Sequence, residues 1–277
     1  MNEITITKVE SMSALEALNR SEIDVQISTA KAYPRDMKRA VNNVVAMACM
    51  DEETASSCFY HLSRKGSDGK DNSIDGESVR FAEILVANWG NIRAQARVVG
   101  NDGKFITAQG VCHDLETNSA ISTEVKVRIT YKNGATYNDD MQNTAGNSAC
   151  AKAFRNAVFK CIPKAVVANA IKQIRAKAVE NNNSDLTNLR AQWIEFYKGQ
   201  NVSIEKILKY LGKDSVDSID GADLVKLQGV YNAVRDGQTS YDTEFNESDK
   251  QEAIAEKAQA KSNAAREKAA AAVKAQG

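Results

Sequence analysis

The stretch that decides the fold class is residues 92–98, whose sequence IRAQARV alternates apolar with polar side chains. A period of two is typical of a β-strand with one buried face. The turn NDG at 101–103 follows, and residues 105–115 then supply a partner strand. After a second turn at 116–119, residues 122–131 alternate in the same way. These segments predict a three-stranded antiparallel β-meander.

Helical periodicity surrounds the predicted meander on both sides. Before it, apolar residues recur at helical spacing over three segments, which are residues 35–49, 51–62 and 77–89. After it comes a long helical stretch at 143–161, which is interrupted near Pro163 and resumes over 164–180. The sequence therefore predicts an α+β fold, in which the antiparallel three-stranded β-meander packs with helices and a long helix follows it.

Composition divides the chain into four parts. We expect an N-terminal arm at residues 1–30 and a core at 31–180, which the polar linker NNNS at 181–184 separates from the rest. Residues 181–239 contain three short amphipathic patterns and predict a small all-α C-terminal domain. The Ala/Lys/Glu-rich residues 240–277 have almost no large apolar side chain, so we expect a disordered, flexible tail.

The sequence lacks the patterns of several catalytic and metal-binding classes. The five cysteines include no C-x-x-C pair, and the two histidines belong to no HExxH motif, which argues against zinc sites and disulfide frameworks. No phosphate-binding loop is present. We therefore expect no metal, no cofactor and no catalytic residue. The pair Asp139 and Asp140 could hold a metal, and a solvated turn is the competing interpretation.

No segment has the length and hydropathy of a membrane span. The longest apolar run, at 44–50, has seven residues, against the ~20 that cross a bilayer. The first residues, MNEIT, include neither the basic region nor the apolar region of a secretion signal. We expect a cytoplasmic protein with no membrane partner.

The net charge of zero hides a strong segregation of charge along the chain. The sequence holds 36 basic and 36 acidic residues, but residues 123–180 alone carry 10 basic and 4 acidic ones. A polyanion is the natural partner for such a basic segment. The alternative is a solvated basic helix whose charge is balanced by acidic neighbours in space.

The predicted meander and the following helix each offer a set of basic side chains. On the sheet these are Arg93, Arg97, Lys126 and Arg128, and on the helix they are Lys152, Arg155 and Lys160. No zinc finger, basic zipper or helix-turn-helix pattern accompanies them, so a basic groove that holds a single strand is favoured. Four aromatic residues are candidate stacking platforms, although an aromatic in such a position is more often part of the core, and they are Tyr33, Tyr131, Tyr137 and Phe159.

Five stretches of the chain resemble a phage protein family associated with recombination. These are AYPR at 32–35, SIDGESVRFAE at 73–83, WGNI at 89–92, HDLETN at 113–118 and AKAFRNAVFKCIP at 151–163. The order of elements is similar to that of the single-strand annealing proteins of the Red-beta, RecT and Erf superfamily. The resemblance covers about residues 28–180. Residues 181–239 resemble the C-terminal module of some phage annealing proteins, with YLG at 210–212 and LQGVY at 227–231.

The resemblance implies a phage recombination protein that anneals single strands without ATP and is not an enzyme. Such a protein coats single-stranded DNA, assembles as a homo-oligomeric ring or helical filament, and pairs the strand with its complement into an annealed duplex intermediate. The core at 31–180 would bind DNA and oligomerise. Tyr33, Arg35, Phe159 and the loop at 64–73 would complete the basic groove. The C-terminal domain would recruit a host single-strand binding protein or a phage exonuclease.

Two other functions remain open at this point. The first is a single-strand binding or replication accessory protein that coats DNA without annealing it. The second is a nuclease that uses the acidic residues Asp139 and Asp140.

Overall fold

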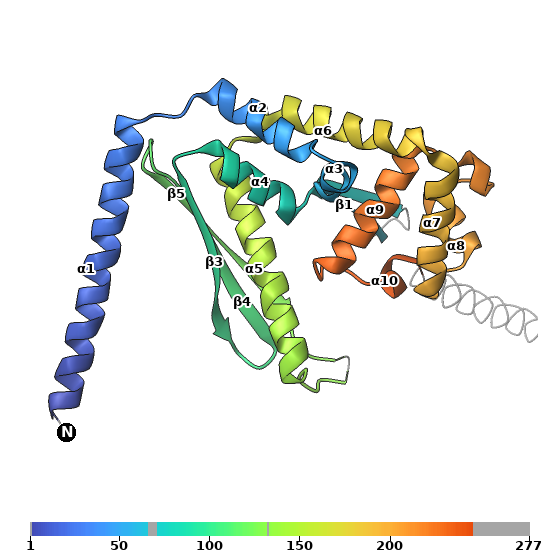
Figure 1. Cartoon of the computed structure of the whole chain (residues 1–277). Coiled ribbons are helices and arrows are strands. Elements are labelled where there is room, and N and C mark those ends of the chain that lie inside the picture. Colours follow the sequence, from blue (N-terminus) through green and yellow to red (C-terminus); the bar gives the residue numbers. More distant parts are fainter. Residues whose placement is uncertain (1, 66–70, 132, 246–277) are drawn as a thin grey trace, which may run out of the picture. The chain divides into compact units, whose positions relative to one another are not determined.

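The structure is a computed structural model of the chain, and it describes residues 2–65, 71–131 and 133–245. The chain divides into two compact units whose segments alternate along the sequence. The first unit combines residues 1–58 with 77–178, and the second combines 59–76 with 179–277. Each unit contains helices and a small β-sheet (Figure 1).

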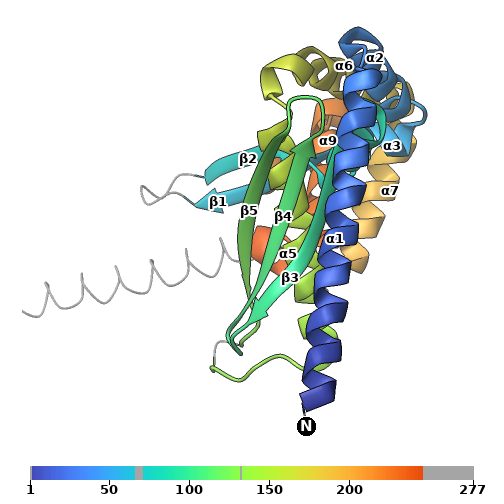
Figure 2. The same cartoon turned by 90° about the vertical axis from the view of Figure 1, so that its left-hand side faces the viewer.

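The predicted three-stranded meander is confirmed in the first unit. Strands β3 (Ile92–Asn101), β4 (Phe105–Asp114) and β5 (Ser119–Arg128) pair antiparallel in the order β3-β4-β5 (Figure 2). The register between β3 and β4 shifts at a bulge between Val98 and Gly100. The fold is therefore α+β, with this sheet packed against helices as the alternating sequence predicts.

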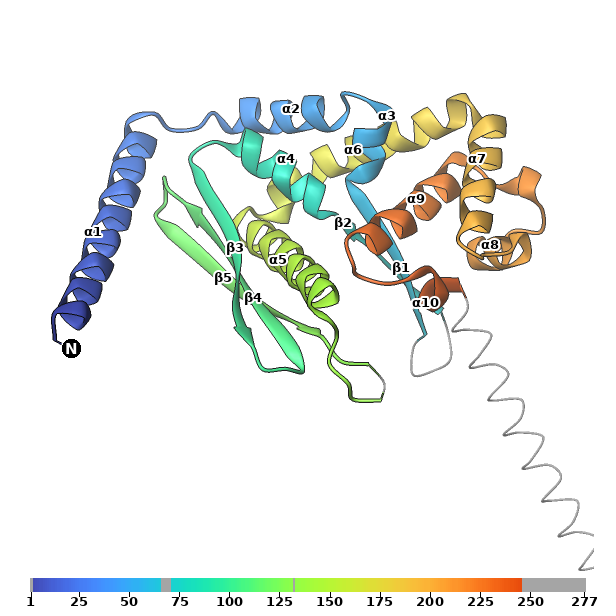
Figure 3. The same cartoon turned by 60° about the horizontal axis from the view of Figure 1, so that its bottom comes forward.

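The long helix after the sheet, α5 (Asp139–Cys161), covers one face of the sheet (Figures 1 and 3). Its buried stripe consists mainly of small residues, so the helix backbone approaches the strands closely. Gly110 of β4 lies directly under this helix, and a Cβ there would fall on the carbonyl of Ala153. The hydroxyl of Thr123 on β5 donates to the same carbonyl at 3.0 Å. Small residues on both surfaces therefore fix where α5 sits.

Four further helices belong wholly or largely to the first unit. They are α2 (Met37–Ala48), α3 (Glu52–Ser57), α4 (Val79–Trp89) and α6 (Lys164–Ser184). Side-chain oxygens of Asp36, Asp51 and Ser78 accept from backbone N–H groups at the starts of α2, α3 and α4, which stabilises these ends. The helices predicted at 35–49 and 77–89 are confirmed. The helix predicted at 51–62 is wrong beyond Ser57, where the chain enters a strand.

The segment expected as an N-terminal arm at residues 1–30 forms one long helix, α1 (Asn2–Ala32). Among its described side chains, Ala30 is buried, whereas Leu18 and Val25 are exposed. None of the helices in the described part of the chain is long and apolar enough to cross a membrane.

The second unit combines a β-hairpin with the C-terminal helices. The hairpin is β1 (Phe59–Lys65) and β2 (Asp71–Glu77), and the helical elements are α7 (Leu186–Gly199), α8 (Ile204–Leu211), the 3-10 helix η1 (Val216–Ser218), α9 (Gly221–Arg235) and α10 (Tyr241–Phe245). Helix α9 packs on β1, and Asn232 donates a hydrogen bond to the carbonyl of Phe59 at 2.9 Å. Tyr197 is fully buried in the core of this unit and donates to the carbonyl of Leu227 at 2.6 Å.

Three expectations for this region need correction. Residues 181–239 form only helices, as predicted, but the unit also includes the β1-β2 hairpin, to which the segment expected as a loop at 64–73 contributes the ends of both strands. The expected linker at 181–184 continues α6. The start of the expected tail at 240–277 is structured instead, because Tyr241–Phe245 form α10 and Phe245 is buried. The rest of that tail, and the middle of the expected loop at 66–70, lie outside the described residues.

Candidate nucleic-acid interface

The β3-β4-β5 sheet has an inner face against α5 and an outer face that points away from it. Along β4, buried residues alternate with half-buried ones, and the buried set includes Ile106, Ala108 and Cys112. The strand register places the remaining residues on the outer face, where Arg93 pairs with His113, Arg97 with Gln109, Lys126 with Thr107 and Arg128 with Phe105. The four basic residues predicted on the open face of the sheet thus share one face.

Three of these cations are exposed and available to a ligand. Arg97, Lys126 and Arg128 form no ion pair with any described residue. The guanidinium of Arg128 lies 5.0 Å from the ring centre of Phe105 and donates to Thr130 at 3.3 Å, which orients it without neutralising it. Lys126 and Arg128 are two residues apart on one strand, so their backbones are roughly 7 Å apart along it. One carboxylate, Glu124, shares the outer face of β5.

Arg93 differs from the other outer-face cations because α1 approaches it. Its guanidinium donates to Glu22 and to Gln26 of that helix, each at 3.3 Å. Both the Arg93 and the Glu22 side chains keep substantial solvent exposure, so this ion pair contributes little to stability. Arg93 therefore marks the end of the basic surface, next to α1.

The basic residues predicted on the helix do not join the sheet residues in one groove. Lys152, Arg155 and Lys160 belong to α5, which packs on the inner face of the sheet. The basic strand residues lie on the opposite, outer face. Lys160 is exposed, while Lys152 and Arg155 are half-buried and interact with other groups. The expectation of a single groove lined by both sets is wrong. The helical pattern did not indicate which face of the sheet α5 would cover.

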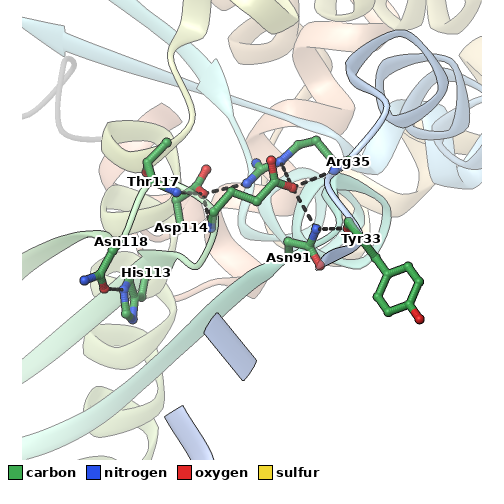
Figure 4. A network of polar contacts seen from close by, with 8 residues as sticks. Tyr33, Arg35, Asn91, His113, Asp114, Thr117 and Asn118 are labelled. Atoms are coloured by element: carbon green, nitrogen blue, oxygen red, sulfur yellow. Dashed lines mark hydrogen bonds and ion pairs between the residues drawn. The ribbon is translucent and has the colours of Figure 1, made fainter. Parts of the chain in front are cut away.

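Arg35, expected in the groove, instead ties the chain after α1 to the β4-β5 turn (Figure 4). Its guanidinium donates to Glu116 at 2.9 Å and to Asp114 at 2.6 Å, and its side chain is only 6% exposed. Its backbone N–H also donates to Glu116, at 2.7 Å. With both carboxylates already satisfying the guanidinium, Arg35 has no role as a phosphate ligand here.

Asn91 completes this polar network, which we call the Arg35 cluster (Arg35, Asn91, Asp114 and Glu116). Its amide donates to Glu116 at 2.7 Å and to the carbonyl of Tyr33 at 2.8 Å. Burial by itself would raise the pKa of Glu116, but hydrogen bonds from Asn91 and Arg35 outweigh it and lower that pKa below its ordinary value. The cluster was missed in the sequence, where only the local signal of a DxET turn at 114–117 was present.

The predicted stacking residues separate into exposed and packed aromatics. Tyr33 is 76% exposed, and its ring points away from the Arg35 cluster (Figure 4). Phe159 instead stacks on the fully buried Phe81, with 5.9 Å between ring centres, so its assignment to DNA is corrected to a core contact. Tyr131 and Tyr137 meet edge to face at 4.7 Å, and Tyr131 remains 44% exposed.

Polar residues between the cations also belong to the outer face and were not singled out in the sequence. Gln109 and Ser122 form a hydrogen bond at 3.2 Å across β4 and β5, and His113 pairs with Asn118 at 2.9 Å. For Gln109 and His113 the signal that could have found them is the period of two in β4, because they alternate with its buried residues.

The acidic pair considered for a metal lies at the start of α5. Asp139 and Asp140 are exposed in its first turn, beside the capping residue Asn138, where carboxylates favour the helix N-terminus. No group of three or more potential metal ligands forms within the described residues. This position therefore has a structural explanation that needs no metal.

No protein-family model, curated protein or solved structure matches this chain. The surface chemistry of the first unit is therefore what supports a function.

Proposed function

We propose that this chain binds single-stranded DNA on the outer face of the β3-β4-β5 sheet and anneals it to a complementary strand without a nucleotide cofactor. The observation that carries the proposal is a sheet with one packed face and one basic face. Arg97, Lys126 and Arg128 project from that second face without an ion-pair partner among the described residues. Cations repeated along a strand suit a phosphate backbone, whose neutralisation drives binding.

The chemistry of the outer face favours a single strand over a sequence-specific duplex site. The cations of the outer face lie on strands, with polar residues such as Gln109 and Ser122 between them, and not on a helix that could enter a major groove. Phosphates held on the sheet would leave the base edges directed away from the protein. Exposed base edges are what pairing with a second strand requires, and no catalytic side chain is needed for it.

Annealing along a continuous strand needs neighbouring subunits that hold successive segments. The proposal therefore includes a homo-oligomer, either a ring or a helical filament, in the cytoplasm of a phage-infected bacterium. The second unit would recruit a host single-strand binding protein or a phage exonuclease. These parts of the proposal come from the sequence resemblance.

The second candidate function is a single-strand binding or replication accessory protein that does not anneal. It is favoured by the same outer face, because the basic residues alone account for binding to a single strand. Annealing requires in addition that the bound bases stay accessible to the complementary strand. The two functions differ in what happens to a complementary strand after the first strand is coated.

Mixing the purified full-length chain with two complementary labelled oligonucleotides, without nucleotide or metal, separates these functions. We expect duplex to form faster than in protein-free controls, as measured by fluorescence energy transfer between the strands. Binding of each strand with slower duplex formation would support the accessory protein. Degradation of either strand on addition of Mg²⁺ would support a nuclease, and the absence of binding would reject all three.

A further inference from the structure

A small open pocket lies beside the Arg35 cluster, at the end of the sheet where β3 begins. Its volume is about 190 Å³, and its lining includes Tyr33, Arg39, Asn43, Asn88, Trp89 and Asn91. All of these residues belong to the first unit. Sites for whole small-molecule ligands start at about 300 Å³. The pocket therefore suits one planar ring system and not a complete nucleotide cofactor.

The pocket offers hydrogen-bond acceptors as well as donors. Asn88 uses its amide N–H₂ for the carbonyl of Ile84 at 2.8 Å, and Asn91 uses its own for Tyr33 and Glu116. The Oδ1 atoms of both asparagines accept no hydrogen bond from the described residues. Arg39 is exposed at the same pocket and supplies donors.

Trp89 adds an unusual feature to the lining. The residue is 3% exposed, and its indole N–H is buried with no acceptor in the part of the chain that the structure describes. Buried N–H groups are nearly always paired, so one without a partner needs an explanation such as a bound molecule or a water.

The exposed ring of Tyr33 is held on a fixed backbone. Its N–H donates to Thr29 at 2.9 Å, and its carbonyl accepts from Asn91. The next two residues are Pro34, with its fixed backbone torsion, and Arg35, anchored to Glu116. An aromatic ring at 76% exposure on such a support is accessible for stacking and contributes little to the core.

These features select one class of ligand. An anion alone would have the acceptor oxygens of Asn88 and Asn91 among its surroundings, and an apolar molecule would give those amides no partner. A nucleobase has a flat π face for Tyr33 and an edge that both donates and accepts hydrogen bonds. Asn91 lies two residues before Arg93, so the pocket adjoins the end of the basic outer face.

We propose that the pocket binds one unstacked nucleobase of a bound single strand. Tyr33 stacks on the base, while Asn88 and Asn91 contact its edge and Arg39 contacts the adjacent phosphate. This inference rests on the proposed single-strand binding and adds a base contact to what is otherwise a backbone interface. One base per subunit would occupy the pocket, and this contact would set the position of the bound strand on each subunit.

The test compares ordinary oligonucleotides with oligonucleotides of the same length made entirely of abasic residues. For the full-length chain, we expect Tyr33→Ala to weaken binding of the ordinary strand about tenfold, the size of one base–aromatic stack. The same variant should bind the abasic strand like the wild type, and Tyr33→Phe should restore binding of the ordinary strand. Asn88→Ala, which removes an acceptor assigned to the base edge, should weaken only the ordinary strand, whereas Asn42→Ala, outside the pocket, should weaken neither.

Equal losses on both strands, or no loss in Tyr33→Ala, would overturn the base pocket while leaving outer-face binding intact. If the wild type binds neither strand, the proposed function fails, and titration with free deoxynucleosides then tests the pocket alone. Binding of deoxynucleosides that Tyr33→Ala abolishes would support the pocket without the DNA function. Absence of that binding would overturn the pocket as well.

Discussion

The two faces of the β3-β4-β5 sheet are built from alternate residues of the same three strands, yet they have opposite chemistry. The inner face consists of small and apolar residues such as Ala108 and Gly110, pressed against α5. The outer face has Arg97, Lys126 and Arg128, which form no ion pair with a described residue. Helix α5 covers the first face, whereas these cations of the second face are exposed.

This contrast shows why the same residue type has different roles in one unit. Arg35 lies between two carboxylates and is nearly buried, so it supports the fold. Arg97 is exposed and has no such partner within the described residues, so its charge is available to an anion. The two arginines therefore differ in their ion-pair partners and in their burial, although both have the same guanidinium group.

The largest expected effect comes from the inner face. Gly110→Ala would place a Cβ on the carbonyl of Ala153, and α5 would have to move away from the sheet. We expect a loss of about 3 kcal/mol in the free energy of unfolding, typical of overpacking a tight contact. Thermal unfolding followed by circular dichroism measures it.

Gly100→Ala is the matched control, because its added Cβ would meet Thr107 at 3.9 Å, an ordinary contact distance. This variant should unfold close to the wild type. If the two alanine variants unfold alike, α5 does not pack on the sheet as described.

The next effect concerns the arginine that supports the fold. Arg35→Met removes the cation between Asp114 and Glu116 and leaves two partly buried carboxylates without their main donor. We expect a loss of about 2 kcal/mol, below the 3–5 of fully buried pairs because both carboxylates keep some solvent contact. Chemical denaturation gives this value. Arg97→Met should change stability by less than about 0.5 kcal/mol; equal losses in the two variants would remove the distinction between them.

A smaller effect follows from the titration of Glu116. Its pKa is lowered in the folded chain, so its contribution to stability is present above the pKa of an unfolded glutamate, ~4.3, and is lost as the pH falls through the lower folded value. The stability difference between wild type and Glu116→Gln should therefore be constant near neutral pH and shrink in acid. Melting temperatures of both proteins across this range check it, and a difference that grows in acid would contradict the network.

Local patterns were sufficient to predict the meander and the helix after it. The period of two in residues 92–98 specifies which side chains share a face, so the common face of Arg97, Lys126 and Arg128 followed from sequence. The same alternation marks the apolar face that packs on helices, but it cannot specify that α5 is the helix that covers this face. That depends on the fit between Gly110 and Ala153, 43 positions apart in the printed sequence. The predicted single groove failed for this reason.

Contacts between distant segments account for the other differences. The partners of Arg35 lie 79 and 81 residues away, so nothing beside it in sequence indicated an ion pair. The hairpin β1-β2 is stabilised by α9, where Gly229 lies against His61 with no room for a side chain. Residues 59–76 therefore belong with the C-terminal helices and not with the helices that flank them in sequence.

The central claim is that the outer face, and not α5, holds the DNA backbone. Its most direct test is the salt dependence of binding to a labelled oligothymidylate, measured by fluorescence anisotropy for two charge-matched triple variants. One variant changes Arg97, Lys126 and Arg128 to Gln, and the other changes Lys152, Arg155 and Lys160 to Gln. Circular dichroism first establishes that both are folded.

We predict that the outer-face variant binds more weakly and that its slope of log affinity against log salt falls by about 2, which is ~0.7 for each lost phosphate contact. The α5 variant should keep the wild-type slope. A fall in slope in the α5 variant with an unchanged outer-face variant would contradict the account.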